Sequence, residues 1–170
     1  DGVPIWRDGR EPTAADIAGR TAQFHAPYHA TLKAEIDRVR ALHGVAIVYD
    51  CHSIRSRIPW LFDGVLPDFN TGTDGGKTCD AKIEAAVHGL CQASGRTSVL
   101  NGRFRGGWTT RHYGRPATGV HAIQMELAQS AYLSTEAPPF DLDSAKADVL
   151  RPTLAAILNS LNSLAPRLTA

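Results

Sequence analysis

The sequence predicts an α/β fold, in which helices pack in layers against a sheet of short buried strands. Apolar residues recur at helical spacing after Pro12 and stop at Gly44, and the short apolar run 45–49 follows at once. A second helical pattern, over about 80–94, is likewise followed by a short apolar run at 98–100. Helices that alternate with short apolar strands are typical of layered α/β domains.

The first helix is predicted from its start, its apolar stripe and its end. Thr13 is followed three residues later by Asp16, which resembles a capping box. Gly44 is a plausible end, because glycine commonly closes helices. The stripe between them has helical spacing and consists of Ile17, Phe24, Tyr28, Leu32, Ile36, Val39 and Leu42.

Beyond these elements the pattern predicts two long loops, one more strand and a last helix. Pro152 either kinks that helix or lies in its first turn. The pattern predicts only three strands, which are few for such a sheet. We therefore expect part of the sheet to lie outside this sequence. The predicted elements are loops at 53–80 and 103–119, a strand at 120–125 that ends at Glu126, and a helix marked by Val149, Leu154, Ile157, Leu158 and Leu161.

Length and composition fit one globular domain over residues 1–170. Hydrophobic residues make up 43% of the chain, charged residues 21%, and the net charge is +1 without a basic block. We therefore expect neither a nucleic acid nor a membrane partner. Cys51, Cys79 and Cys91 form no Cys-x-x-Cys pair, which disfavours a disulfide framework or a thiolate zinc cluster and favours a cytoplasmic location.

The most informative stretch is 50–56, Asp-Cys-His-Ser-Ile-Arg-Ser, which follows the apolar run 45–49. It places an acid, an imidazole and a guanidinium near the carboxyl end of a buried strand, where open α/β sheets bind ligands. His52 is a candidate zinc ligand or, alternatively, a hydrogen-bonded histidine of a polar loop. Asp50 is a candidate to orient His52 by accepting its second ring N–H, or else a turn-capping acid.

Other polar residues near strand ends and in the loops have two readings each. Glu126 is a candidate general base beside a metal-bound water, or a surface residue that begins a helix. Asn70 and Asn101 either donate to a substrate carbonyl or shape turns. Six loop arginines either hold an anionic small substrate or are solvated charge: Arg55, Arg57, Arg103, Arg105, Arg111 and Arg115.

Five blocks of the sequence, read together, resemble a known family. The stretch 50–56 is similar to the Asp-x-His-Ser-Ile-Arg-Ser segment of N-formylglutamate amidohydrolases, also called N-formylglutamate deformylases. Four further blocks follow in the order of that family, and the five together are specific where each alone is weak. These further blocks are residues 66–73, 101–107, 110–116 and 121–127.

The resemblance implies a three-layer α/β sandwich with a mixed, mostly parallel sheet, related to zinc exopeptidases. By position in the motifs it implies that His52 is a zinc ligand and Glu126 the residue that activates water. Arg55 and Arg111 would hold the two substrate carboxylates, and Asn70, Asn101 and Arg103 are further substrate-binding candidates. The N-terminal motifs of the family are absent, so we expect this chain to be the C-terminal part of a longer enzyme, with the other metal ligands upstream of Asp1.

The activity that the resemblance implies is zinc-dependent hydrolysis of N-formyl-L-glutamate to L-glutamate and formate, a step of histidine breakdown. One alternative is a related amidase that acts on another N-acyl amino acid or on a peptide amide. The other is an inactive module that only binds anionic amino acids. The sequence leaves the oligomeric state open.

Overall fold

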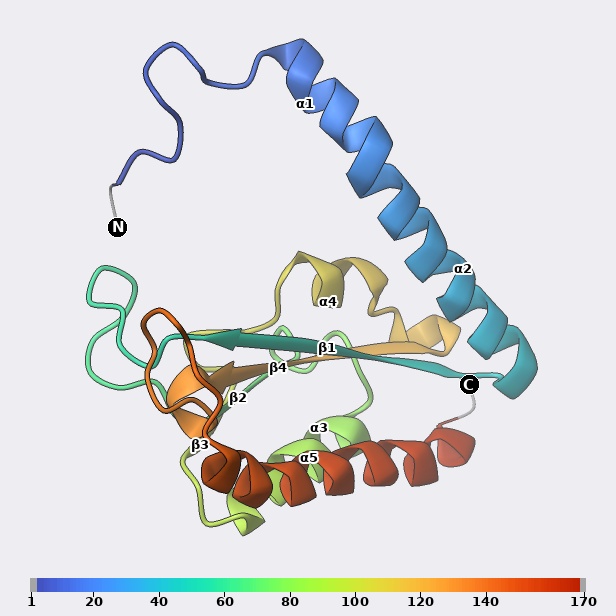
Figure 1. Ribbon diagram of the computed structural model, residues 1–170. Helices are drawn as coiled ribbons and strands as arrows, with labels where there is room; N and C mark the ends of the chain where they lie inside the picture. The colour runs from blue at the N-terminus through green and yellow to red at the C-terminus, as the bar shows by residue number, and fades with distance from the viewer. Residues whose placement is uncertain (1–2, 169–170) are drawn as a thin grey trace.

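The computed structural model describes residues 3–168 and has a central sheet with helices on both faces (Figure 1). The helices are α1 (Ala14–Arg20), α2 (Ala26–His43), α3 (Ala81–Ala93), α4 (Trp108–Tyr113) and α5 (Ser144–Leu164). The strands are β1 (Ala46–Ile54), β2 (Phe69–Gly72), β3 (Ser98–Leu100) and β4 (Val120–Ala128). A π-helical segment, Thr21–His25, joins α1 to α2, and three short 3-10 turns follow α4, β4 and α5.

The four described strands lie in the order β1-β4-β2-β3. β1 and β4 pair in parallel, as do β2 and β3, whereas β2 and β4 are antiparallel. The sheet is therefore mixed, as the family resemblance implies. None of the helices within residues 3–168 is long and apolar enough to cross a membrane.

Alternate residues of β1 and β4 point to opposite faces of the sheet, and each face has its own apolar cluster. On one face α3 and α5 pack against Val45, Ile123 and Met125. On the other face the second half of α2 and the short α4 pack against Ala46 and Val120. The helices thus form two outer layers around the sheet, in agreement with the predicted three-layer sandwich.

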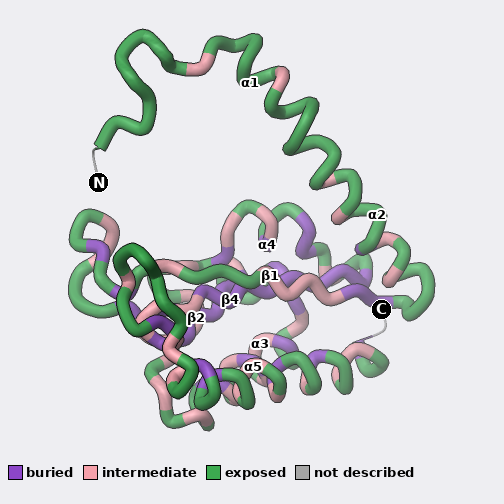
Figure 2. The backbone as a smooth tube through the Cα atoms, viewed as in Figure 1, coloured by how far each residue is buried: buried purple, intermediate pink, exposed green. Residues whose placement is uncertain are grey.

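The predicted first helix is present, and its start and end are as expected. Thr13 and Asp16 form a reciprocal capping box, and Gly44 closes α2 in the left-handed conformation, φ 75°. Only the part of the apolar stripe from Leu32 to Val39 is covered, and Leu42 at its end is exposed. Leu32, Ile36 and Val39 pack against the sheet, but the first half projects away from it (Figure 2).

Two elements were missed because their sequences look like loops. β2, with the sequence Phe-Asn-Thr-Gly, lies within the predicted loop 53–80, since Asn and Gly are uncommon in strands. It is nevertheless fully buried, because it pairs with β3 on one side and β4 on the other. α4 lies in the predicted loop 103–119 and has only six residues, too few for a periodic pattern.

The remaining differences concern element ends. β1 and β4 continue to Ile54 and Ala128, so His52 and Glu126 lie within strands and not just after them. Glu126 therefore does not begin a helix. Pro152 lies in the interior of α5, beyond its first turn.

Candidate active site

The candidate site lies on the face of the sheet that α4 covers only in part. In the parallel β1–β4 ladder, Asp50 is opposite Gln124 and His52 is opposite Glu126. In the antiparallel β2–β4 ladder, Asn70 is also opposite Glu126. These five side chains share one face on three neighbouring strands, because side chains at alternate positions of a strand point the same way. The fold thus brings Asp50, His52, Asn70 and Glu126 together, and the sequence predicts this proximity for Asp50 and His52.

Asp50 and His52 form an acid–imidazole pair. His52 Nε2 lies 2.9 Å from Asp50 Oδ1, and the second carboxylate oxygen of Asp50 lies 3.3 Å from the Thr110 hydroxyl, which donates to it. Asp50 is largely buried, whereas the His52 side chain is 45% exposed. The buried acid therefore fixes the ring while one side of that ring remains accessible from outside.

Glu126 is a buried carboxylate, with 6% of its surface exposed. Burial raises the pKa of its carboxyl above the ordinary value, because a charge is less well solvated inside the protein. Nearby His52 and the hydrogen bond from Gln124 lower the pKa, while Asp50 raises it. A carboxylate with a raised pKa, held beside an accessible imidazole, is suited to accept a proton from water.

Gln124 links Glu126 to the start of α4. Its Nε2 donates to Glu126 Oε2 at 3.2 Å, and its Oε1 accepts a hydrogen bond from the Gly107 backbone N–H. Gln124 and Thr110 are site residues that the sequence analysis did not single out. The spacing in the sequence could have indicated Gln124, because it precedes Glu126 by two residues and so shares its face of the strand.

The loop before α4 sits close to the sheet because Gly72 has no side chain. A Cβ at Gly72 would lie 2.4 Å from the Gly106 nitrogen, closer than atoms can approach. The contact lets loop 101–107 pass directly over the end of β2 and bring Gly107 to Gln124. It is the physical reason why glycine is needed at position 72.

The asparagines use their side chains within the fold. Asn70 Nδ2 donates to the carbonyls of Pro67 at 2.7 Å and Glu126 at 3.1 Å, while its buried Oδ1 has no hydrogen-bond partner among residues 3–168. Asn101 accepts hydrogen bonds from the backbone N–H groups of Thr73 and Gly75 and donates to the Thr73 hydroxyl. Asn101 thus shapes a turn, which was one of the two readings of this residue.

The three arginines singled out for substrate binding contact loop groups in the structure. The Arg55 guanidinium lies 5.5 Å from the centre of the Trp60 ring, beside a hollow of about 370 Å³ that Ser53, Gln129 and Phe140 also line. Arg103 donates to the Leu61 carbonyl at 3.0 Å, and Arg111 donates to the Gly106 carbonyl. Their role toward a substrate stays a prediction.

The residues present do not by themselves fit a complete zinc site. Catalytic zinc is held by three protein ligands and a water. Within the described range 3–168, no group of three or more His, Cys, Asp and Glu side chains is placed to hold a metal ion. His52 can offer one ring nitrogen, so further ligands would have to come from beyond these residues.

Fold and site together define an α/β protein with a hydrolase-like cluster of carboxylate and imidazole groups. The family model described as N-formylglutamate amidohydrolase matches residues 1–133, so the chain belongs to this family. The family was thus identified correctly from the five sequence blocks.

Individual relatives agree with the family match. The chain is 46% identical over 165 residues to the N-formylglutamate deformylase of Pseudomonas aeruginosa PAO1 and 45% identical to that of Pseudomonas putida. These matches cover 96% of the chain but 60% of each relative, so the chain spans less than two thirds of their length. The crystal structure of N-formylglutamate amidohydrolase from Ralstonia eutropha JMP134 has the same fold, with a TM-score of 0.76 at 23% identity, over 89% of this chain and 55% of that one.

Proposed function

We propose that this chain carries the general base of an N-formylglutamate deformylase, and that the complete protein hydrolyses N-formyl-L-glutamate to L-glutamate and formate. The observation that carries the proposal is the buried Glu126 beside the Asp50–His52 pair, in a chain of the N-formylglutamate amidohydrolase family. A small amino acid derivative is also what the relatives' names indicate as their substrate.

In this proposal Glu126 acts first as the proton acceptor and then as the proton donor of the reaction. It accepts a proton from water as the water oxygen bonds to the formyl carbon, and it returns a proton to the nitrogen as the carbon–nitrogen bond breaks. Gln124 holds the carboxylate in place through its amide, and Asp50 holds the His52 ring. Arg55 and Arg111 are the proposed partners of the substrate carboxylates, because a guanidinium binds a carboxylate with two hydrogen bonds.

Zinc is part of the proposal only as a bound group for which His52 supplies one nitrogen. The test uses a longer protein, in which this chain is joined to the part of a relative that it does not span. Its zinc content is measured by mass spectrometry. His52→Ala should lower the zinc content, and His112→Ala, which removes an exposed histidine of α4, should not. An unchanged stoichiometry in His52→Ala would rule out ligation by His52.

Formate release from N-formyl-L-glutamate by the same protein tests the catalytic role. Glu126→Gln should reduce kcat by at least about 100-fold, because it removes the proton acceptor and keeps the shape. The control is Glu35→Gln, which alters an exposed carboxylate of α2 and should leave turnover unchanged. Turnover of Glu126→Gln near the wild-type rate would remove Glu126 from this role.

The two alternatives are separated by substrate and by binding. Faster turnover of N-acetyl or N-carbamoyl analogues than of the formyl compound would favour a related amidase. For the 170-residue chain alone, the incomplete set of metal ligands favours a binding module. Calorimetric titration with L-glutamate, together with a formate assay, checks this: binding without turnover would identify the module.

A further inference from the structure

The segment between β4 and α5, residues 129–143, packs against the end of the 50–56 stretch (Figure 1). The Tyr132 hydroxyl of this segment lies 2.7 Å from the Ser53 hydroxyl. Further along the segment, the Glu136 carboxylate reaches the last residue of the stretch. The family model matches the chain up to residue 133. The segment thus meets the stretch at two points, and the second lies beyond the family match.

Three hydrogen bonds hold the Glu136 carboxylate, and we call them the Glu136 clamp. Its Oε1 accepts the N–H groups of Ser56 at 2.7 Å and Ser130 at 2.8 Å, and its Oε2 accepts the Ser56 hydroxyl at 2.6 Å. Ser56 is only 5% exposed, so the clamp is shielded from water on that side. Among residues 3–168 no basic side chain forms an ion pair with Glu136. Because hydrogen bonds to a charged carboxylate are stronger than neutral ones, the clamp joins its partners firmly.

The clamp begins where the ladder between β1 and β4 ends. Ile54 and Ala128 are the last paired residues of the ladder, and Ser56 and Ser130 lie two positions further along each chain. Glu136 Oε1 therefore joins the two chains beyond their last pair. The candidate base and the imidazole lie before that pair, so the ladder holds them whether or not the clamp is present.

Arg55 lies between the ladder and the clamp. The planar peptide unit that carries the Ser56 N–H also contains the Arg55 carbonyl, so the clamp fixes the backbone on one side of Arg55. The Ser56 carbonyl accepts the Leu66 N–H at 2.8 Å, which closes the loop 57–65 that contains Trp60. The Arg55 guanidinium lies 5.5 Å from the centre of the Trp60 ring. In the described part of the chain it forms no ion pair, so its charge is available to an anion.

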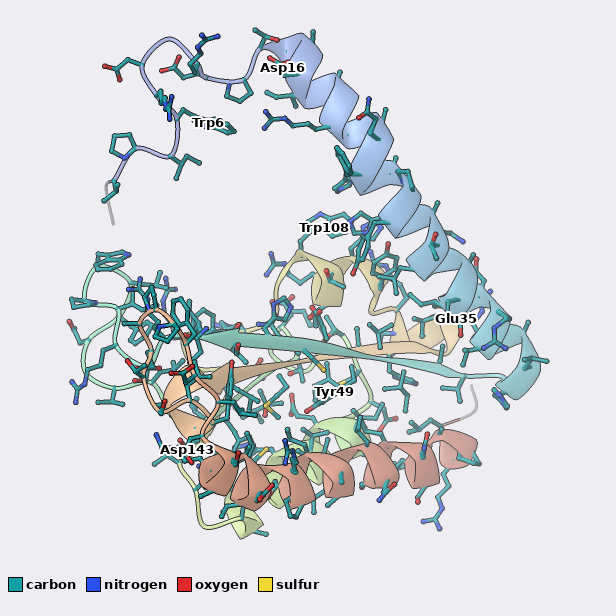
Figure 3. The ribbon with its side chains drawn as sticks, in the orientation of Figure 1. Trp6, Asp16, Glu35, Tyr49, Trp108 and Asp143 are labelled. Carbon is teal, nitrogen blue, oxygen red and sulfur yellow. The ribbon has the colours of Figure 1, made fainter. Side chains whose placement is uncertain are left out.

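The segment 129–143 is itself well anchored, so it can hold Glu136 in place. The Asp143 N–H donates to the Tyr132 carbonyl at 2.9 Å, which closes the segment into a loop. Figure 3 labels Asp143 at the start of α5, and its side chain caps this helix by accepting the Lys146 N–H at 3.0 Å. The clamp is therefore connected to α5, which packs on the sheet.

We propose that Glu136 is a positioning residue, which holds Arg55 where its guanidinium binds a carboxylate of N-formyl-L-glutamate. The proposal rests on the proposed function, because it takes Arg55 as the partner of a substrate carboxylate. The ladder holds the base and the imidazole independently of the clamp. Loss of the clamp should therefore weaken substrate binding and leave the chemical step little changed, which appears as a higher KM at a similar kcat.

The test measures formate release by the longer protein, in which this chain is joined to the part of a relative that it does not span. Glu136→Ala should raise KM for N-formyl-L-glutamate at least about tenfold and change kcat less than about threefold. Glu136→Gln should keep KM within about threefold, because the amide oxygen still accepts both backbone N–H groups and the amide nitrogen can donate to the Ser56 oxygen. The control is Asp141→Ala, which removes an exposed acid of the same segment and should leave KM unchanged.

A double-mutant cycle with Arg55→Met tests whether Glu136 acts through Arg55. Arg55→Met should itself raise KM, and adding Glu136→Ala should raise it less than about twofold further. A merely structural role would give Glu136→Ala the same effect in both backgrounds. If circular dichroism shows that Glu136→Ala does not fold, Ser56→Ala takes its place in the cycle. It removes only the hydroxyl contact and should raise KM about threefold, and only when Arg55 is present.

Calorimetric titration with L-glutamate makes the same comparison without turnover. The dissociation constant should rise at least about tenfold in Glu136→Ala and stay unchanged in Asp141→Ala. A protein that binds L-glutamate in this way but releases no formate would contradict the proposed function and leave the role of Glu136 standing.

Three results would overturn the proposal. One is an equal effect of Glu136→Ala with and without Arg55→Met, which would make its role structural. Another is a lower kcat at unchanged KM, which would place Glu136 with the chemical step. The last is binding of L-glutamate that Glu136→Ala does not weaken, or that Asp141→Ala weakens as much.

Discussion

The two faces of the sheet are built from the same strands but differ in what covers them. The face under α3 and α5 is closed over Phe69, Ile123 and Met125, all at most 2% exposed. The opposite face is closed by α2 and α4 only over the first half of β1 and β4, and beyond α4 it carries Asp50, His52 and Glu126. One face therefore supplies stability, while the other carries a row of polar groups in which His52 is exposed and Glu126 is buried.

The largest effect that tests this comparison is the loss of an aromatic residue on the closed face. Phe69→Ala should lower the free energy of unfolding by about 3–5 kcal/mol, since Phe69 is fully buried between β2 and the helices. Urea unfolding followed by circular dichroism measures it. A cost below about 1 kcal/mol would mean that this face is not the main source of stability.

A smaller loss is expected from Gln124 on the open face. Gln124→Met should lower the free energy of unfolding by about 2 kcal/mol, because the Gly107 N–H and Glu126 both lose a hydrogen-bond partner. The same urea experiment measures it, and Gln92→Met, an exposed residue of α3, is the control. Equal stability of Gln124→Met and wild type would show that the amide does not tie α4 to the sheet.

For Glu126 we expect a change of opposite sign. Glu126→Gln should raise the free energy of unfolding at pH 7.5 by about 1 kcal/mol, because the fold no longer has to bury a charge whose pKa is raised. Thermal melting gives the direction. A lower melting temperature would indicate that the carboxylate stabilises the fold and is not held there at a cost.

The smallest effect concerns pH and His121 on the closed face. Burial lowers the pKa of His121, with Asp80 opposing, and its Nδ1 accepts a hydrogen bond from the Asp80 N–H at 3.1 Å, which requires the neutral ring. A group with a lowered pKa stabilises the fold above its ordinary pKa of 6.5 and less as the pH falls below it. Urea unfolding at pH 7.5 and 5.5 should thus show a larger loss of stability for wild type than for His121→Gln. Equal losses would contradict a buried neutral His121.

Local signals in the sequence were enough for the elements whose patterns are long or have clear ends. Neighbouring residues determine the capping box at Thr13, the left-handed Gly44 and the helix α3. These features can therefore be predicted without the rest of the fold. β2 and α4 are different. Their residues have weak intrinsic preferences, and contacts with strands and helices distant in the chain decide their conformation.

The sequence by itself determined the family, through five blocks in order, and it singled out Asp50, His52 and Glu126 as residues to examine. Only the tertiary structure decided which of the polar residues meet. The parallel register of β1 and β4 places His52 opposite Glu126, and β2 adds Asn70 to the same row. Register depends on pairing between residues distant in the chain, 74 positions apart for His52 and Glu126 and 56 for Asn70 and Glu126. A single-residue shift would turn these side chains to the other face. The acid–imidazole–carboxylate group is therefore a product of strand pairing, which no single segment of the sequence contains.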